Sequence, residues 1–164
     1  MSTTAYDIVE SPIGPLLITA EDGALTRLYM SPFHLDSAWV RDPGVLAEPA
    51  RQLAEYFAGE RTQFELLLRP AGTDFQRAVW DLLLGIPYGE TSTYGALALE
   101  LGDPRKVRAV GLANGRNPIS IVVPCHRVIG ADGSLTGYGG GLERKRHLLE
   151  LEAEVAAGFR ATLW

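Results

Sequence analysis

The segment ISIVVPCHRVIG, residues 119–130, contains the only cysteine of the chain, Cys125, with His126 directly after it. A thiol becomes a nucleophile where electropositive, partly exposed surroundings favour its thiolate form, and His126 and Arg127 could supply such surroundings. Neighbouring residues of an extended chain project in different directions, so we expect a bridging water to carry the proton from Cys125 to the imidazole. The alternative is that Cys125, at the end of an apolar run, is only a small core hydrophobe.

A catalytic imidazole needs a partner that holds its orientation, and this partner is usually a carboxylate. The C-terminal segment GLERKRHLLELEAEVAAG predicts a helix in which Glu152 lies four residues after Leu148 and three before Val155, on their apolar face. A carboxylate on a core-facing stripe is costly unless it is paired. We therefore predict a relay from Cys125 through a water to His126 and Glu152. In the alternative, Glu152 reaches solvent or pairs with an arginine.

Two stretches near Cys125 could shape a pocket. Asn117 precedes a proline, which favours an extended or turn conformation, and it either clamps the pocket wall or bonds to its own backbone in a turn. The stretch GYGGG, residues 137–141, exposes backbone amides and the ring of Tyr138. Such a loop suits a flat ligand, although a single glycine-rich stretch is weak support for one.

The composition restricts the class of protein. The chain has 164 residues, 46% of them hydrophobic and 21% charged, which is enough for one mid-sized domain or two small ones. A single cysteine excludes an internal disulfide, and the scattered histidines suggest no metal site, so we expect neither a metal nor a cofactor. We see no signal peptide and no apolar run near the roughly 20 residues of a membrane span. We expect a cytoplasmic protein that does not bind membranes.

Charge is distributed unevenly along the chain, although the net charge is −5. Residues 1–90 contain 6 Lys and Arg residues against 13 Asp and Glu residues, whereas residues 104–127 contain five basic residues and no acidic one. A polyanion responds to the local field more than to the total charge. The basic stretch is therefore either a nucleic-acid contact or a solvated basic face.

The patterns predict an α+β fold with two domains. In residues 1–70, short apolar runs separated by Ser-Pro, Gly-Pro and Asp-Gly predict a small antiparallel sheet of the α/β-roll kind. PARQLAEYFAGE adds a helix, and QFELLLRP adds a further strand. RPAGTD reads as the linker to a mostly helical domain, residues 71–164.

Two short helices are predicted upstream of Cys125, in TSTYGALALELG and GDPRKVRAVGLANGRNP. Asp103 is a good N-cap for the second helix, and Pro104 suits its first position. A helix pair with a short glycine-containing turn and a basic second helix is the pattern of a helix-turn-helix, although any helical hairpin can share it. Small residues in the second helix let its backbone approach either a ligand surface or another helix: Ala109, Gly111, Ala113 and Gly115.

The motif PCHRV, preceded by NGRNPISIV and followed by TGYGGGLERKRHLLELE, closely resembles the O6-alkylguanine-DNA alkyltransferase family in its bacterial stand-alone form. RAVGLANGRNP, IPYGETSTYGALA and SPIGPLL fit this family as well, so the resemblance covers nearly the whole chain. It implies direct-reversal DNA repair with base flipping. The protein would transfer an alkyl group from O6 of guanine, and from O4 of thymine, irreversibly to its own cysteine. This enzyme would act once, as a methylated-DNA–protein-cysteine methyltransferase.

The resemblance also implies a role for each matching residue. Cys125 would accept the alkyl group, while His126 takes the thiol proton through a water and Glu152 holds the imidazole. Asn117 would support the active-site turn. Tyr94 would help to rotate the nucleotide out of the duplex and donate a proton toward guanine N3.

The same resemblance places residues around the flipped base and in the DNA groove. Arg108 would fill the gap that the base leaves, and the small residues Ala109, Gly111 and Gly115 would let their helix enter the minor groove. Tyr138 and Gly139 would line the base pocket with the Gly139 amide near O6, and the Val128 carbonyl would face the exocyclic amine. Relatives often have Ser at the position of Gly139. The partner would be double-stranded DNA with O6-alkylguanine, bound by a monomer, with cooperative binding along DNA left open.

Three other functions compete with this one. A Cys–His–Glu hydrolase would use the same side chains but would turn over, which requires an oxyanion hole. A DNA-damage binding module would not need Cys125, and a helix-turn-helix regulator would leave ISIVVPCHRVIG without a purpose. Because an S-alkyl thioether has no easy leaving group and no second cysteine is present to restore the thiol, we expect a protein that is consumed stoichiometrically.

Overall fold

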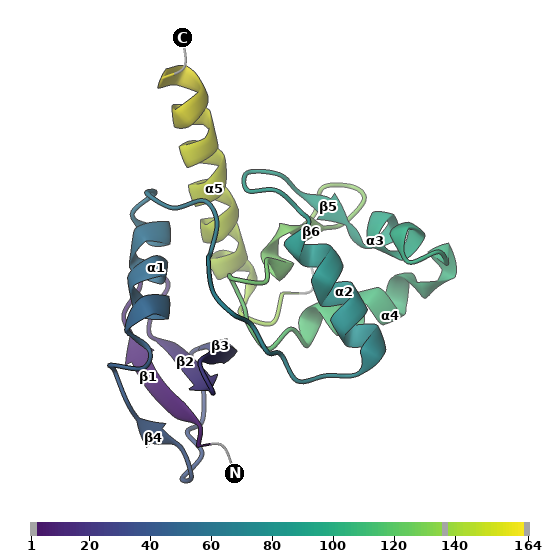
Figure 1. Ribbon diagram of the computed structural model, residues 1–164. Helices are drawn as coiled ribbons and strands as arrows, with labels where there is room; N and C mark the ends of the chain where they lie inside the picture. The colour runs from purple at the N-terminus through teal and green to yellow at the C-terminus, as the bar shows by residue number, and fades with distance from the viewer. Residues whose placement is uncertain (1–2, 136–137, 163–164) are drawn as a thin grey trace. The chain divides into compact units, whose positions relative to one another are not determined.

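The computed structural model describes the backbone of residues 3–135 and 138–162 and the side chains of residues 3–135 and 138–158. The chain forms two compact units, drawn in Figure 1. Unit 1 comprises Met1–Ala71 and Pro118–Val122, and unit 2 comprises Gly72–Asn117 and Val123–Trp164.

Unit 1 is built on a four-stranded sheet in the order β3-β2-β1-β4. The three longer strands are antiparallel, with β1 at Ala5–Val9, β2 at Leu16–Glu21 and β3 at Ala24–Met30, whereas β4, Val40–Arg41, pairs parallel to β1. The connection between β2 and β3 is the two-residue loop Asp22-Gly23, in which φ is +50° and +79°. Positive φ at both positions is typical of a type I′ hairpin turn, which Asp-Gly favours.

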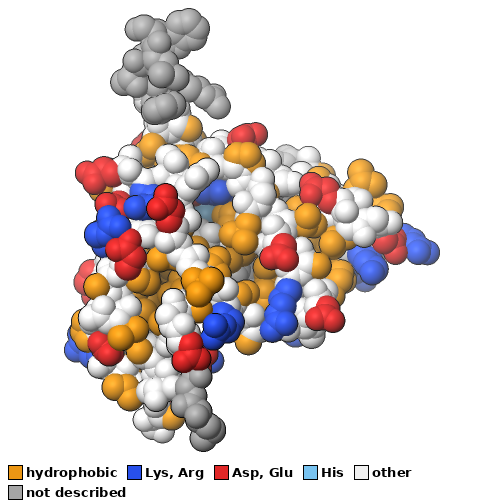
Figure 2. Space-filling model, in the orientation of Figure 1, with side chains coloured by type: hydrophobic (Ala, Val, Ile, Leu, Met, Phe, Trp, Pro, Cys, Tyr) orange, Lys and Arg blue, Asp and Glu red, His pale blue; other side chains and the backbone are white. Residues whose placement is uncertain are grey.

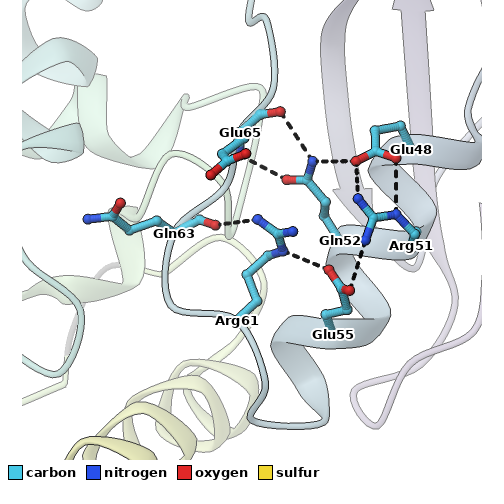
Figure 3. A network of polar contacts seen from close by, with 7 residues as sticks. All are labelled: Glu48, Arg51, Gln52, Glu55, Arg61, Gln63 and Glu65. Carbon is cyan, nitrogen blue, oxygen red and sulfur yellow. Dashed lines mark hydrogen bonds and ion pairs between the residues drawn. The ribbon is translucent and has the colours of Figure 1, made fainter.

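The helix of unit 1, α1, spans Ala47–Phe57 and is tied to the chain that follows it by a polar network (Figure 3). The buried Gln52 amide donates to Glu48 Oε1 at 2.8 Å and to the Glu65 carbonyl at 3.2 Å, and its oxygen accepts from the Glu65 amide at 2.9 Å. Arg61 Nε donates to Glu55 Oε1 at 2.9 Å. These bonds hold the segment after α1 against the helix without extending the sheet.

The predicted strand QFELLLRP is reduced to one isolated bridge. Leu68 pairs parallel with Leu25, through bonds of 2.8 Å from Leu25 N to Leu67 O and 2.9 Å from Arg69 N to Leu25 O. The first half of the segment instead bonds to the Gln52 side chain. The prediction of a full strand was therefore wrong, because a helix side chain satisfies the backbone that a strand would have used.

Residues 118–122 group with unit 1, although they lie between two segments of unit 2. Leu28 of β3 donates from its amide to the Pro118 carbonyl at 2.9 Å and accepts from the Ser120 amide at 3.2 Å. The excursion turns at Ile121, where φ is +72° and the Val122 amide bonds to the Ser120 carbonyl at 2.8 Å. This is a γ-turn of the positive-φ kind, which is rare and strained for a β-branched residue.

Unit 2 is mostly helical, with α2 at Asp74–Leu84, α3 at Tyr94–Glu100, α4 at Val107–Gly115 and α5 at Leu142–Thr162. Short 3₁₀ turns η1, Pro104–Lys106, and η2, Cys125–Arg127, precede α4 and the short strand β6, Val128–Ile129. β6 pairs parallel with β5, Ser92–Thr93. None of the described helices combines the length and the apolar composition that crossing a membrane requires.

Side-chain caps determine where the helices of unit 2 begin. A capping box opens α2, because the Thr73 hydroxyl accepts from the Gln76 amide at 3.1 Å while the Gln76 side chain accepts from the Thr73 amide at 3.0 Å. Thr93 caps α3, and Asp103 caps η1 as its sequence position predicts. The elements confirm the predicted α+β class and the helix pair α3–α4.

Candidate active site

Cys125 lies at the start of η2, at the end of a buried apolar run. Its amide donates to the Val123 carbonyl at 2.8 Å across Pro124, whose φ of −83° and ψ of 64° are those of an inverse γ-turn. Proline is suited to the centre of this turn because its ring restricts φ to this range. The turn ends the apolar run and starts the 3₁₀ turn that contains Cys125, His126 and Arg127.

The imidazole of His126 is bonded to a carboxylate of the last helix. His126 Nε2 lies 2.7 Å from Glu152 Oε2, and both side chains are buried. Arg127 completes the cluster, because its Nε and a terminal nitrogen donate to Glu152 at 2.8 and 3.0 Å. Its other terminal nitrogen donates to the Ile86 carbonyl at 2.7 Å. Glu152 thus pairs with the histidine and with an arginine at once, which combines two interpretations that the sequence left as alternatives.

The charges of this cluster are set by burial and hydrogen bonds. Burial would raise the pKa of Glu152, but the hydrogen bonds from His126 and Arg127 outweigh it and lower that pKa to about 2. Burial lowers the pKa of His126, and the positive charges of Arg127 and Lys145 lower it further, against the opposing effect of Glu152. At neutral pH the cluster therefore holds an ionised Glu152 beside a neutral His126.

The protonation of the imidazole follows from its partner. An ionised carboxylate can only accept, so Nε2 carries the hydrogen and donates it to Glu152. Nδ1 then has a free lone pair, and within the described part of the chain this buried nitrogen has no hydrogen-bond partner. The site therefore presents a neutral, oriented base on the residue directly after Cys125.

Two asparagine amides hold the backbone around Cys125. Asn117 Nδ2 donates to the Val123 carbonyl at 2.8 Å and so joins the two ends of the 118–122 excursion. Asn114 Nδ2, on the buried face of α4, donates to the Cys125 carbonyl at 3.4 Å. The Asn117 bond reaches a carbonyl six residues further along the chain. Asn114 was not identified from the sequence. Its signal was its position four residues after Val110 on the inner face of a predicted helix.

A buried lysine supports the segment after Cys125. Lys145, in the first turn of α5, donates from Nζ to the Val128 carbonyl at 2.6 Å and is closed off from solvent. This bond uses one of the two lone pairs of that carbonyl. Nζ also lies 5.9 Å from the ring centre of Tyr138, whose pKa is raised well above its usual value by burial and then by the charge of Cys125. Lys145 was missed because LERKRH looks like a solvated run of charges.

The helix pair places the other predicted residues on two faces. Tyr94 begins α3, and its ring contacts α4 at Gly111, where an added Cβ would lie 3.9 Å from Tyr94 Cδ1. Arg108, Ala109 and Gly115 lie on the exposed side of α4. Gly139 has room beside it among the described residues, where a Cβ would meet the Gly115 carbonyl oxygen at an ordinary contact distance of 3.7 Å. Across the described residues, no group of three or more His, Cys, Asp or Glu side chains could hold a metal ion.

Comparison with known proteins identifies both halves of the chain. Residues 4–70 match the ribonuclease-like domain, and residues 74–154 the DNA binding domain, of 6-O-methylguanine DNA methyltransferase. The methylated-DNA–protein-cysteine methyltransferase of Mycobacterium tuberculosis is 55% identical over 150 residues, which cover 90% of this chain and 91% of the relative. The enzyme of that name from Methanosarcina barkeri is 51% identical over 151 residues, covering 90% and 96%.

Solved structures agree with these matches. The crystal structure of Mycobacterium tuberculosis O6-methylguanine methyltransferase superposes with a TM-score of 0.87 at 53% identity and covers 93% of this chain and 94% of its own. The structure of Mycobacterium tuberculosis OGT in complex with DNA has a TM-score of 0.88 at 54% identity, with 92% and 94% covered.

Proposed function

The chain belongs to the 6-O-methylguanine DNA methyltransferase family, and from this premise we propose that Cys125 removes the alkyl group of O6-alkylguanine in double-stranded DNA in a single irreversible transfer. Enzymes of this kind move a methyl group from DNA to a cysteine of the protein, and this chain has one cysteine. The observation that carries the proposal is the position of that cysteine, directly before a neutral imidazole whose other nitrogen is bonded to an ionised Glu152.

The first step generates the thiolate. The proton of the Cys125 thiol passes through a bridging water to His126 Nδ1, the buried nitrogen that has no hydrogen-bond partner among the described residues. The imidazolium that forms is stabilised by Glu152, 2.7 Å from Nε2. Glu152 is in turn kept ionised and oriented by Arg127. Arg127 and Glu152 are thus positioning residues, and His126 is the base.

The second step transfers the alkyl group. The Cys125 sulfur attacks the carbon bound to O6, so that an S–C bond forms as the C–O bond breaks and its electron pair remains on guanine. Tyr94 donates a proton toward N3 of the leaving base and becomes a tyrosinate. It regains a proton when the His126 imidazolium releases the thiol proton to solvent, so the thiol proton in effect replaces the alkyl group on guanine. The same displacement applies to O4-alkylthymine. Asn117 and Asn114 keep the backbone around Cys125 in place during the reaction.

The target base has to leave the stack before the sulfur can reach it, because the reacting carbon is inaccessible inside the duplex. Arg108 fills the gap from the exposed side of α4, and the small residues Ala109, Gly111 and Gly115 let the helix approach the minor groove. Tyr138, Gly139 and the Val128 carbonyl receive the flipped base. That carbonyl accepts from Lys145 and keeps a second lone pair for the exocyclic amine.

The product is a thioether, and the chain contains no other cysteine that could restore the thiol. We therefore infer that each molecule carries out one transfer. We also infer that the protein acts as a monomer and that it acts in the cytoplasm, where thiols stay reduced. The test is a titration of the full chain against a duplex with one O6-methylguanine, followed by counting the restored guanine. A plateau at one guanine per protein supports the proposal, whereas continued turnover with an unchanged cysteine would favour a hydrolase.

A further inference from the structure

The exposed side of α4 contains two large apolar side chains, Val107 at its first position, 40% exposed, and Leu112 nearer its centre. The helix buries Val110, Ala113 and Asn114 within unit 2, and the Trp80 indole donates to the Ala113 carbonyl at 2.8 Å on this inner side. Leu112 points the other way and is 66% exposed. The exposed positions nearest to it, Ala109 and Gly115, are small, so Leu112 is the apolar side chain that protrudes from the middle of this face.

Two arginines lie on the same side, one helical turn before and after this leucine. Arg108, Leu112 and Arg116 are spaced four residues apart, which separates neighbours by about 6 Å along the helix axis. Within the described part of the chain, neither arginine forms an ion pair, and residues 104–127 contain no acidic side chain. Figure 2 shows basic and hydrophobic side chains, with acidic ones among them, at the end of unit 2 where α3 connects to α4. The face is therefore electropositive with an apolar centre.

We propose that Leu112 is a wedge that enters the minor groove next to Arg108 and stabilises the DNA with the target nucleotide extruded. This inference rests on the proposed function and concerns the opening of the duplex, not the chemistry at Cys125. The arginines are attracted to the phosphates at either side of the groove, which brings the leucine against base and sugar edges. Apolar side chains inserted at a base step unstack it and bend the duplex. Moving the leucine side chain out of water and into the groove is favourable in free energy.

A leucine exposed on its own is common on protein surfaces and needs no function, and unit 2 contains an example. Leu99 of α3 is also 66% exposed, but it is followed by Glu100, and Asp103 lies one turn further on. Acidic side chains repel a phosphate backbone, so this leucine is not expected to meet DNA. Leu99 is thus a control of the same residue type, the same exposure and the same unit.

Replacing Leu112 leaves the reactive cluster intact, because its side chain is directed away from the inner face of α4. Asn114, which bonds to the Cys125 carbonyl, belongs to that inner face. Leu112→Ala and Leu99→Ala should therefore fold with a Tm close to that of the unchanged protein. They should also react equally fast with iodoacetamide at Cys125, a reaction that needs no DNA.

The experiment measures single-turnover alkyl transfer by the unchanged protein, Leu112→Ala and Leu99→Ala on two duplexes. In one, O6-methylguanine is opposite cytosine, and in the other it is opposite an abasic site, where it needs less help to leave the stack. We expect Leu112→Ala to be roughly tenfold slower on the first duplex and less than about twofold slower on the second. Leu99→Ala should match the unchanged protein on both.

The other possible outcomes would overturn either this inference or the proposed function. If Leu112→Ala equals the unchanged protein on the paired duplex, or is equally impaired on both duplexes, Leu112 has no role in opening the stack. A loss of iodoacetamide reactivity in Leu112→Ala, or an equal defect in Leu99→Ala, would also overturn the inference. If the unchanged protein transfers no alkyl group from either duplex, it is the proposed function that fails.

Discussion

His126 Nε2 and Glu152 Oε2 lie 2.7 Å apart in a part of unit 2 that is closed off from solvent. This contact joins a residue of the 3₁₀ turn at Cys125 to a residue in the middle of the last helix. Because Arg127 bonds to the same carboxylate, one residue determines both the imidazole tautomer and the neutralisation of a buried guanidinium. Stability and reactivity are thus coupled at Glu152.

Replacing Glu152 with glutamine should destabilise the protein and slow alkyl transfer together. Glutamine keeps the shape but leaves Arg127 as a buried cation without its counter-charge, and removing one partner of a buried ion pair costs about 3–5 kcal/mol. Urea unfolding of Glu152→Gln measures this loss. Glu154→Gln, on the exposed side of the same helix, is the control and should be unchanged. Equal stability of the two variants would contradict the account.

The stability of the protein should decrease in two separate ranges as the pH is lowered. Burial depresses the pKa of His126 below 6.5, so the unfolded chain binds that proton more readily and stability decreases below about pH 6.5. The pKa of Glu152 is lowered from 4.5 to about 2, so its stabilising effect is complete above pH 4.5 and is lost as pH falls toward 2. Thermal unfolding as a function of pH measures both, with the exposed His147→Gln as control. A profile that is flat from pH 7 to pH 3 would be inconsistent with these pKa values.

The proposed role of His126 as the base predicts a change in thiol reactivity. His126→Gln removes the neutral nitrogen that takes the thiol proton, so alkyl transfer should slow by about 10²–10⁴-fold. The pH profile of iodoacetamide alkylation at Cys125 should shift to higher pH, because the thiolate loses its acceptor. A slower transfer with an unshifted profile would indicate that His126 acts on the substrate and not on the thiol.

Asn117 is predicted to act through the hydrogen bond that it donates to the Val123 carbonyl. Asn117→Asp keeps the size but replaces the donor with an acceptor, which leaves the buried Val123 carbonyl without that bond. We expect a loss of about 1–3 kcal/mol in unfolding free energy and slower transfer, because the Cys125 turn starts at Val123. Chemical denaturation and single-turnover rates measure the two effects. Unchanged values for both would show that the clamp is dispensable.

Two glycines of unit 2 should differ in how much an added side chain lowers the stability of the protein. Gly139→Ser should change the free energy of unfolding by less than about 0.5 kcal/mol, because among the described residues its Cβ would meet an ordinary contact at 3.7 Å. It should slow the transfer of bulky alkyl groups relative to methyl. Gly89→Ala should be clearly destabilising, since φ is +80° and the new Cβ would lie 2.9 Å from the Ala156 Cβ. Differential scanning calorimetry and a comparison of methyl and benzyl substrates test this pair.

Local patterns predicted the parts of the structure that depend on neighbouring residues. The Asp22-Gly23 turn and the Asp103 cap follow from residue types alone. The placement of Glu152 on a buried face follows from helical spacing. In each case the deciding interaction lies within a few positions of the residue, so the sequence contains enough information.

The parts that depend on distant partners could not be predicted in this way. Nothing near Pro118 indicates that it will bond to Leu28 of unit 1. Nothing in LERKRH distinguishes Lys145, which is buried against the Val128 carbonyl, from the other charged residues of this segment. Arg127 stands beside His126 in the sequence, yet its shared use of Glu152 appears only when the last helix is in place. Tertiary contacts outweigh local polarity at these positions.

The most direct test of the central claim is peptide mass spectrometry after incubation with a duplex that contains one O6-methylguanine. The account predicts that the peptide with Cys125 gains the mass of one methylene, up to one group per protein molecule, and that Cys125→Ser gains none. An unmodified Cys125 peptide from protein that still binds the damaged duplex would contradict it and leave a protein that senses the damage without repairing it.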